Sequence, residues 1–154
     1  VRNKEMSSLS DVECCTLRSR YISYVYQFFN LISFLTVKEN VCLASQIKGK
    51  KVDEKELNQV LKLLGLEHKK NRFANELSGG QQQRVAIARA ILAHTDIILA
   101  DEPTGNLDGE NAKNVMDILK ALNKEGKTIV LVTHALKIAN YADRIIRLEQ
   151  GKIV

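Results

Sequence analysis

Cysteine is scarce in this 154-residue sequence, and its placement argues against the usual cysteine-based sites. Cys14 and Cys15 are neighbours, which places them poorly for bridging each other, and Cys42 stands apart from both. No spacing typical of a metal site or a redox pair is present. The pattern favours reduced thiols in a cytosolic environment.

Long apolar runs are also lacking. The longest apolar-rich window, residues 21–35, is interrupted by several polar side chains, whereas a membrane-spanning helix needs about 20 predominantly apolar residues. Residues 1–20 are polar and charged, so no secretory signal is visible. Because the sequence starts at Val1 and not at Met, we expect it to be part of a longer native protein.

A block of charge of one sign is absent as well. The net charge is +5, but the basic residues are scattered among acidic ones. This distribution favours a solvated surface over a nucleic-acid-binding face, and an anionic membrane leaflet would tolerate it. With 45% hydrophobic residues, the chain can bury an ordinary core and is one domain or part of one.

The most informative stretch starts at Ser78, just before an apolar periodic run. Ser78 and Gln81 have the spacing of a capping box, which predicts a helix start. Gly79 and Gly80 are not explained by capping, because glycine costs a helix up to about 1 kcal/mol against alanine. A bare helix N-terminus suits an anion such as phosphate. An ordinary capped helix remains the alternative.

An apolar segment, residues 97–100, ends in Asp101 and Glu102. A strand with acidic residues at its end can hold magnesium and position a water molecule. Successive strand side chains point in opposite directions, so we assign Asp101 to magnesium and Glu102 to the attacking water. Pro103 is expected to keep Glu102 extended. Two acids at a solvated strand end are the alternative.

Two further strands are expected to end beside this pair. Residues 21–26 are followed at once by Gln27, and the apolar residues 128–132, expected as a buried parallel strand, are followed one residue later by His134. Alternating strands and helices predict an α/β fold with a mostly parallel sheet. Because parallel strands share a carboxyl edge, the polar residues can converge there.

The intervening segments are expected to be helical. Capping residues predict helices after Thr36 (with Glu39), Asp53 (with Glu56) and Asp108. The non-periodic apolar stretch 28–35 has two interpretations of equal weight, as core or as an exposed interface, which the family resemblance described next would make a groove for a transmembrane partner. Arg84 and Arg89 are expected to be solvent-facing or capping charges.

The order of Gln27, Leu77–Gln81, Asp101–Glu102, Asp108 and His134 resembles the nucleotide-binding subunit of an ABC transporter. The run Ala100 to Asp108 is similar to a bacterial subgroup that works in lipoprotein release, macrolide or antimicrobial-peptide export and cell division. The resemblance implies a P-loop NTPase-like three-layer α/β fold. It places a helical subdomain with the signature motif at about 30–93 and the Walker B, D-loop and H-loop part of the catalytic core at 94–154.

The resemblance also implies roles for individual residues. Gln27 would touch magnesium and the attacking water, His134 would contact the γ-phosphate, and Asp108 would lie at the interface of a dimer. The signature residues Ser78, Gly79, Gly80 and Gln81 would act on ATP bound by the partner subunit. The family usually has aspartate after the histidine, whereas Ala135 stands here.

One expected part of such a subunit is not found. The phosphate loop Gly-x-x-x-x-Gly-Lys-Ser/Thr follows a strand and opens a helix, but the tripeptide Gly126-Lys127-Thr128 has Ala121 at the first glycine position and the reverse context. The resemblance therefore covers about the last two-thirds of a typical subunit, without its N-terminal Walker A region. We expect the chain alone to bind ATP poorly and to expose unpaired sheet edges.

The leading hypothesis is thus a part of an ABC-type ATPase that uses ATP and Mg²⁺. Its partners would be a second nucleotide-binding subunit and a transmembrane permease at the cytoplasmic face of the membrane, with no nucleic acid. One alternative is a non-catalytic or regulatory module that donates its signature to a partner. Another is an ABC-like ATPase of DNA repair, although the long heptad helices typical of that class are not visible.

Overall fold

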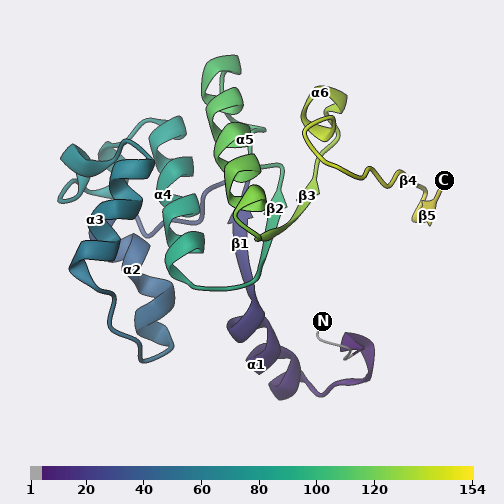
Figure 1. The fold of residues 1–154 in the computed structure, drawn as a ribbon, viewed down its shortest axis with the longest axis horizontal. Helices are drawn as coiled ribbons and strands as arrows, with labels where there is room; N and C mark the ends of the chain where they lie inside the picture. The colour runs from purple at the N-terminus through teal and green to yellow at the C-terminus, as the bar shows by residue number, and fades with distance from the viewer. Residues whose placement is uncertain (1–4) are drawn as a thin grey trace.

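The computed structural model describes residues 5–154 (Figure 1), so the first four residues of the polar N-terminal segment lie outside the described part. Three parallel strands form its central sheet in the order β1-β2-β3. Their bounds are Ile22–Tyr26 for β1, Ile97–Asp101 for β2 and Thr128–Val132 for β3. The register aligns Tyr26 with Asp101 and Asp101 with Val132, so the three carboxyl ends lie level. The predicted α/β class with a parallel sheet is confirmed.

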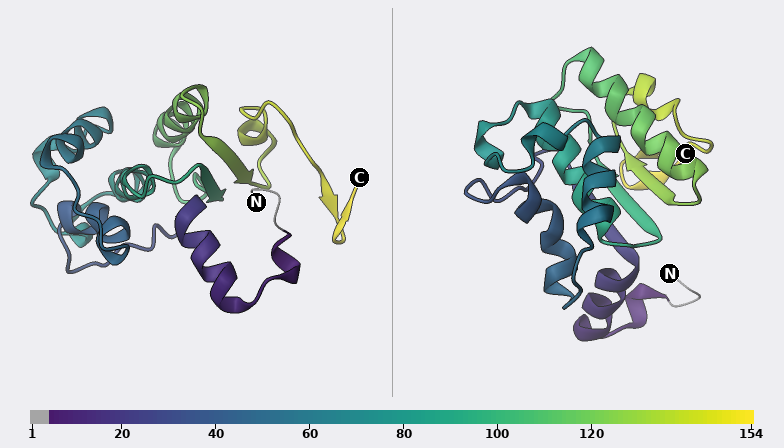
Figure 2. Two further views of the ribbon diagram at one scale, coloured as in Figure 1. Left: turned by 60° about the horizontal axis from the view of Figure 1, so that its bottom comes forward. Right: turned by 60° about the vertical axis from the view of Figure 1, so that its left-hand side comes forward.

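Helices pack against this sheet and extend from it. The helices are α1 (Asp11–Tyr21), α2 (Val37–Ile47), α3 (Glu54–Leu63), α4 (Gly79–Leu92), α5 (Gly109–Lys124) and α6 (Leu136–Ala139). Single-turn helices occur at η1 (Met6–Ser8), η2 (Glu67–Lys69) and η3 (Ala74–Glu76). Helices α4 and α5 contact the strands, and Figure 2 shows them on the same side of the sheet. This placement follows from the right-handed crossover of parallel strands.

Helix α4 is the centre of the core. Figure 1 shows α2 and α3 on its outer side, away from the strands. Enclosed between these helices and the sheet, the second half of α4, residues 85–92, is apolar apart from Arg89. Its fully buried residues include Val85, Ala86, Ile87, Ala88 and Leu92. From the outer layer, Leu57 and Leu61 pack into the same core. Each buried leucine or isoleucine contributes about 1.5–3 kcal/mol.

The burial of β3 differs from the prediction. This strand is parallel to β2, as expected, but Val130 and Val132 are 46% and 57% exposed. The strand lies at an edge of the sheet and alternates between exposed and half-buried residues, because its packed neighbour α5 covers only one face. On the opposite face, Tyr24 and Tyr26 of β1 stack with ring centroids 5.5 Å apart.

Local capping was predicted with mixed success. The boxes at Thr36/Glu39 and Ser78/Gln81 are present, and Asp108 caps α5. Asp53 is the N-cap residue of α3, but its side chain makes no capping hydrogen bond. The carboxylate of its expected partner Glu56 lies instead beside His94, a residue far away in sequence, with Oε1 3.3 Å from Nε2.

The C-terminal segment forms little regular structure. Strands β4 (Leu148–Glu149) and β5 (Lys152–Ile153) make a two-residue antiparallel hairpin, and Figure 1 shows it away from the helices. Gln150 and Gly151 form its turn with positive φ angles. Over residues 5–154, no helix has the length and apolarity needed to cross a membrane.

Candidate functional site

Glu102 occupies a sharp turn directly after β2. Its φ angle is +43°, in the left-handed region, so the expectation that Pro103 keeps it extended is wrong. Two backbone hydrogen bonds fix this conformation: the Glu102 N–H donates to the carbonyl of Val132 at 2.9 Å, and the Gly105 N–H donates to the carbonyl of Glu102 at 3.0 Å. A left-handed non-glycine residue costs about 1–3 kcal/mol and is typical of functional sites.

The turn brings the Glu102 carboxylate to His134. Its Oε1 accepts the His134 backbone N–H at 2.7 Å and lies 2.7 Å from the ring Nδ1. Its Oε2 accepts the hydroxyl of Thr133 at 3.1 Å. Burial alone would raise the Glu102 pKa, but the hydrogen bonds from His134 and Thr133 outweigh it, and the net pKa is lowered. The pair therefore presents an ionised carboxylate beside an imidazole that is 86% exposed.

Gln27 lies at the end of the neighbouring strand β1 and contacts the loop that follows Glu102. Its Nε2 is 3.5 Å from Asn106 Oδ1, and Asn106 Nδ2 donates to the Gln27 carbonyl at 3.0 Å. Gly105 permits this approach, because a Cβ at that position would lie 2.8 Å from Gln27 Nε2. Gly105 and Asn106 were not predicted as site residues from the sequence, although they belong to the run Ala100 to Asp108 that carries the family resemblance.

Asp101 is exposed at the end of β2, level with Tyr26 of β1. Among residues 5–154 there is no group of three or more His, Cys, Asp or Glu side chains that could hold a metal ion. Mg²⁺ is usually held by one or two carboxylates together with substrate phosphates and water. The single carboxylate of Asp101, with the amide oxygen of Gln27 as a second oxygen, fits that mode and not a closed protein cage.

The signature segment, Ser78–Gln81, forms the predicted helix start. Ser78 Oγ accepts the Gln81 N–H at 3.4 Å, and Gln81 Oε1 accepts the Ser78 N–H at 3.1 Å. Ser78 is exposed, whereas Gly80 is buried against α5. A Cβ at Gly80 would lie 2.5 Å from Cγ of Asn111, and a Cβ at Gly79 would lie 3.6 Å from the ring of Phe29. Close packing within the chain is thus a reason for Gly80 that sequence reasoning missed.

Asp108 lies between the turn at Glu102 and helix α5. It is exposed, and its two carboxylate oxygens accept the backbone N–H of Asn111 at 2.9 Å and the Asn111 side-chain amide at 2.7 Å. These hydrogen bonds, the backbone one first, lower the Asp108 pKa. No hydrogen bond is found between Asp108 or the signature segment and the Glu102–His134 pair within the described residues.

Two polar residues of α4 hold loops of the site. Gln83 is completely buried and donates from Nε2 to the carbonyl of Pro103 at 2.6 Å. Arg89 donates from Nη1 to the carbonyl of Asn30 at 2.6 Å and from Nη2 to that of Phe29 at 2.9 Å. Arg89 was expected to be a solvent-facing or capping charge, but it is partly buried, and burial lowers the pKa of its guanidinium. Periodicity alone could not show this, because the acceptors are about sixty residues away in sequence.

The segment after β1 is strained where Arg89 holds it. Phe29 and Asn30 have φ angles of +60° and +47°, so two successive non-glycine residues are left-handed. Further along, Asn40 of α2 is fully buried. Its side chain accepts the Ile32 N–H and donates to the carbonyls of Ile32, Leu35 and Thr36. The loop carries Phe28 and Phe34, which are 74% and 75% exposed.

Ala135 stands where the resembled family usually has aspartate, and this difference has a local effect. Ala135 is the N-cap residue of α6 and makes no side-chain cap, and α6 is only four residues long. Its backbone N–H donates to Thr133 Oγ1 at 3.1 Å, so it supports the hydroxyl that contacts Glu102. The position of His134 against Glu102 is therefore maintained without an aspartate at position 135.

The sequence matches known proteins over its length. A family model described as ABC transporter matches residues 1–105. The chain is 45% identical over 156 residues to the macrolide export ATP-binding/permease protein MacB of Mannheimia succiniciproducens, covering 100% of this chain and 24% of that protein. It is 43% identical over 155 residues to the uncharacterized ABC transporter ATP-binding protein MJ1508 of Methanocaldococcus jannaschii, covering 99% of this chain and 69% of that protein.

Solved structures agree with these sequence matches. The dimeric structure of MJ0796, described as a bacterial ABC transporter cassette, matches with a TM-score of 0.86 at 43% identity. A dimeric post-hydrolysis state of the MJ0796 cassette, bound to ADP and Pi, matches with the same TM-score at 42% identity. Each comparison covers 99% of this chain and 69% of the other.

Proposed function

The chain belongs to the ABC transporter ATP-binding family, and from that premise we propose that it is part of an ATPase that drives transport across the cytoplasmic membrane. It belongs at the cytoplasmic face of that membrane, where it works with a permease and a second nucleotide-binding subunit. Residues 1–154 form a partial nucleotide-binding domain, with the helical subdomain at about 30–93 and the catalytic part at 94–154.

The hydrogen-bonded pair of Glu102 and His134 is the observation that carries the proposal. A carboxylate whose pKa is lowered stays ionised and can orient a water molecule for attack on the γ-phosphate. His134, exposed at the rim, is placed to contact that phosphate. Asp101 and Gln27 hold Mg²⁺, which supplies charge neutralisation to the transferred phosphoryl group.

The signature residues Ser78, Gly79, Gly80 and Gln81 act on ATP bound by the partner subunit, with Asp108 beside them. This part is supported by the exposure of Ser78 and Asp108, and by the dimeric structure of the MJ0796 cassette. The exposed end of α4 offers N–H groups and a partial positive charge to a phosphate.

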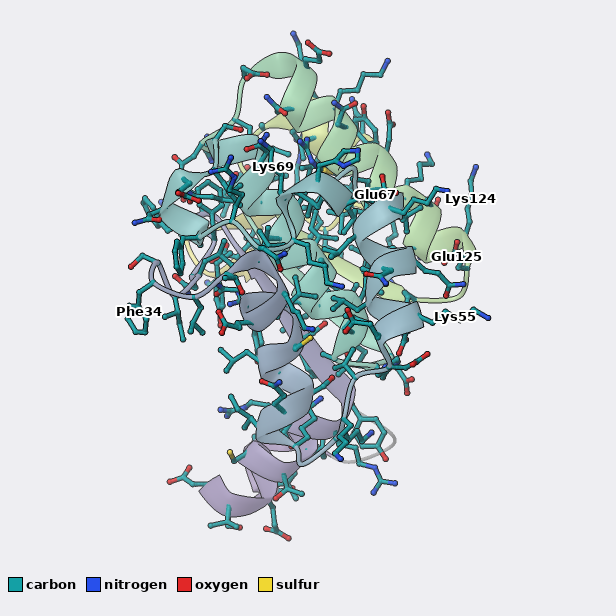
Figure 3. All side chains as sticks on the ribbon, turned by 90° about the vertical axis from the view of Figure 1, so that its left-hand side faces the viewer. Phe34, Lys55, Glu67, Lys69, Lys124 and Glu125 are labelled. Carbon is teal, nitrogen blue, oxygen red and sulfur yellow. The ribbon has the colours of Figure 1, made fainter. Side chains whose placement is uncertain are left out.

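The loop between β1 and α2 is the surface for the permease. Large exposed apolar patches mark interaction surfaces, and two phenylalanines of this one loop, Phe28 and Phe34, are three-quarters exposed while Arg89 and Asn40 fix the loop backbone. Figure 3 shows Phe34 at the edge of the molecule, with lysines and glutamates of the helical side distributed elsewhere. This mixture of signs supports a permease partner over nucleic acid.

A non-catalytic module is the second candidate, because the 154 residues contain no glycine-rich phosphate loop. In that case Ser78–Gln81 would serve only the nucleotide of another subunit. We expect residues 1–154 alone to bind ATP poorly under either function, so the complete gene product must be tested.

The decisive variant is Glu102→Gln in the complete gene product. It removes a group placed at the attacking water and should lower ATP turnover by about 10²–10⁴-fold while ATP binding persists. Glu110→Gln, an exposed acid in the first turn of α5, is the matched control and should leave turnover unchanged. Equal turnover in wild type and Glu102→Gln would contradict the assignment, and a wild type without any turnover would favour the non-catalytic module.

A further inference from the structure

Helices α4 and α5 are in contact at their N-terminal ends. Gly80, in the first turn of α4, is buried there by the side chain of Asn111 in the first turn of α5. A Cβ at Gly80 would lie 2.5 Å from Asn111 Cγ and 3.1 Å from its Nδ2. Real Cβ atoms do not approach a neighbour to 2.5 Å, so glycine and asparagine at these two positions depend on each other.

Asn111 connects three groups with one short side chain. Its Nδ2 donates to the carboxylate of Asp108 at 2.7 Å, and its Oδ1 accepts Nη1 of Arg84 at 3.3 Å. The same amide packs against Gly80. The amide donates to the carboxylate through Nδ2 and accepts from the guanidinium through Oδ1, so aspartate, leucine or alanine at position 111 would lose at least one of these contacts.

The amide is also held in one orientation. Turning it away from Gly80 would break its bond to Asp108 or its bond to Arg84, and bonds to charged groups are stronger than neutral ones. Asp108 in turn is fixed as the N-cap of α5 through the backbone N–H of Asn111. A displacement of Asp108 is therefore passed to the start of α4 through a single side chain.

We propose that Asn111 is a positioning residue that joins the Asp108 carboxylate to the backbone of Gly80, so that the two groups facing the partner's nucleotide move together. The inference rests on the proposed function in one respect, namely that Asp108 and Gly80 face the nucleotide of the partner subunit. The connection itself is a property of this chain and is measurable without ATP.

The test follows Asp108 and Gly80 in the same NMR titration of the chain. The chemical shift of the Asp108 carboxyl carbon reports the pKa of Asp108. The chemical shift of the Gly80 amide reports whether the titration of Asp108 also alters the start of α4. In the wild type, the Gly80 amide should shift with the titration of Asp108. In Asn111→Ala, the Asp108 pKa should rise because a donor is lost, and the Gly80 shift that follows Asp108 should lose most of its amplitude. Asn114→Ala, an exposed asparagine on the same helix, is the control and should behave as wild type.

A suppressor experiment gives an independent answer. Gly80→Ala should lower the thermal midpoint, because the new Cβ meets the Asn111 amide. Adding Asn111→Ala, which removes the three nearest atoms, should restore part of the loss, whereas adding Asn114→Ala should not. If Gly80 still follows the Asp108 titration in Asn111→Ala, or if Asn111→Ala deepens the effect of Gly80→Ala, the inference is overturned. Either failure leaves the Glu102 experiment, and thus the proposed function, unaffected.

Discussion

Replacing Arg89 with methionine should release the loop that follows β1. Methionine keeps most of the apolar stem of arginine but donates no hydrogen bond, so the carbonyls of Phe29 and Asn30 lose both of their guanidinium donors. These carbonyls belong to two successive left-handed residues. In the wild type, the two hydrogen bonds from Arg89 offset the backbone strain of these residues. Without them, the strain favours opening of the loop.

The size of the effect follows from the contacts. A hydrogen bond to a charged group contributes about 1.5–3 kcal/mol. Phe29 is half-buried and Asn30 is exposed, so water replaces part of what is lost. The substitution also removes the free-energy cost of burying the guanidinium, which is visible in its lowered pKa, and this gain offsets another part of the lost stability. We expect a net local destabilisation of about 2 kcal/mol, which corresponds to about 30-fold faster opening-limited exchange.

Amide hydrogen exchange of the loop is the appropriate assay. The N–H groups of Phe29 and Ile32, which are hydrogen bonded to Tyr26 and Asn40, report on the loop. The core of α4 serves as the internal reference. Arg89→Lys should give an intermediate value, because lysine keeps the charge but not the forked geometry. Unchanged loop exchange in Arg89→Met, with α4 equally protected, would refute the idea that Arg89 holds this loop.

Three further outcomes are expected. Because hydrogen bonds lower the Glu102 pKa, the ionised carboxylate stabilises the fold above its unfolded pKa of about 4.3. This contribution should be lost as the pH falls through the pKa of Glu102 in the folded state. Urea unfolding of wild type and Glu102→Gln at several pH values measures it. Gly105→Ala should displace the Gln27 side chain and lower ATPase activity of the complete gene product with little change in stability, whereas Gly109→Ala, with open space around it, should not. Leu61→Ala, in the core, should cost about 2–5 kcal/mol of unfolding free energy. The exposed Leu63→Ala should cost less than about 0.5 kcal/mol, and equal losses in the two would contradict the packing.

The parts of the structure that were predictable from sequence are those decided within a few residues. The capping box of Ser78 with Gln81 depends on partners three positions apart, and so does the box of Thr36 with Glu39. The order of strands and helices followed from apolar patterns in the same way. The α/β class and the level carboxyl ends of the strands could therefore be inferred before any coordinates were known.

The mispredicted features depend on residues far apart in sequence. Glu56 does not complete its box, and its carboxylate lies beside His94 instead. Glu102 is left-handed because its N–H reaches Val132 of the next strand, a partner that outweighs the local preference imposed by a following proline. Burial of β3 depends on which face a helix covers, and apolar character alone does not contain that information.

Helix α4 makes contacts with several segments that are far apart in sequence, and its central position explains why. It is buried between the outer helices and the sheet, so it cannot tilt without disturbing both. Three of its residues hold different segments: Gly80 packs on Asn111 of α5, Gln83 binds the carbonyl of Pro103, and Arg89 binds the loop after β1. A helix interior transmits displacement along its axis because every turn is bonded to the next. A displacement of the loop at one end of α4 therefore acts on the hydrogen bonds of Arg89 and Gln83 and on the packing of Gly80 against Asn111, which lie along the same helix.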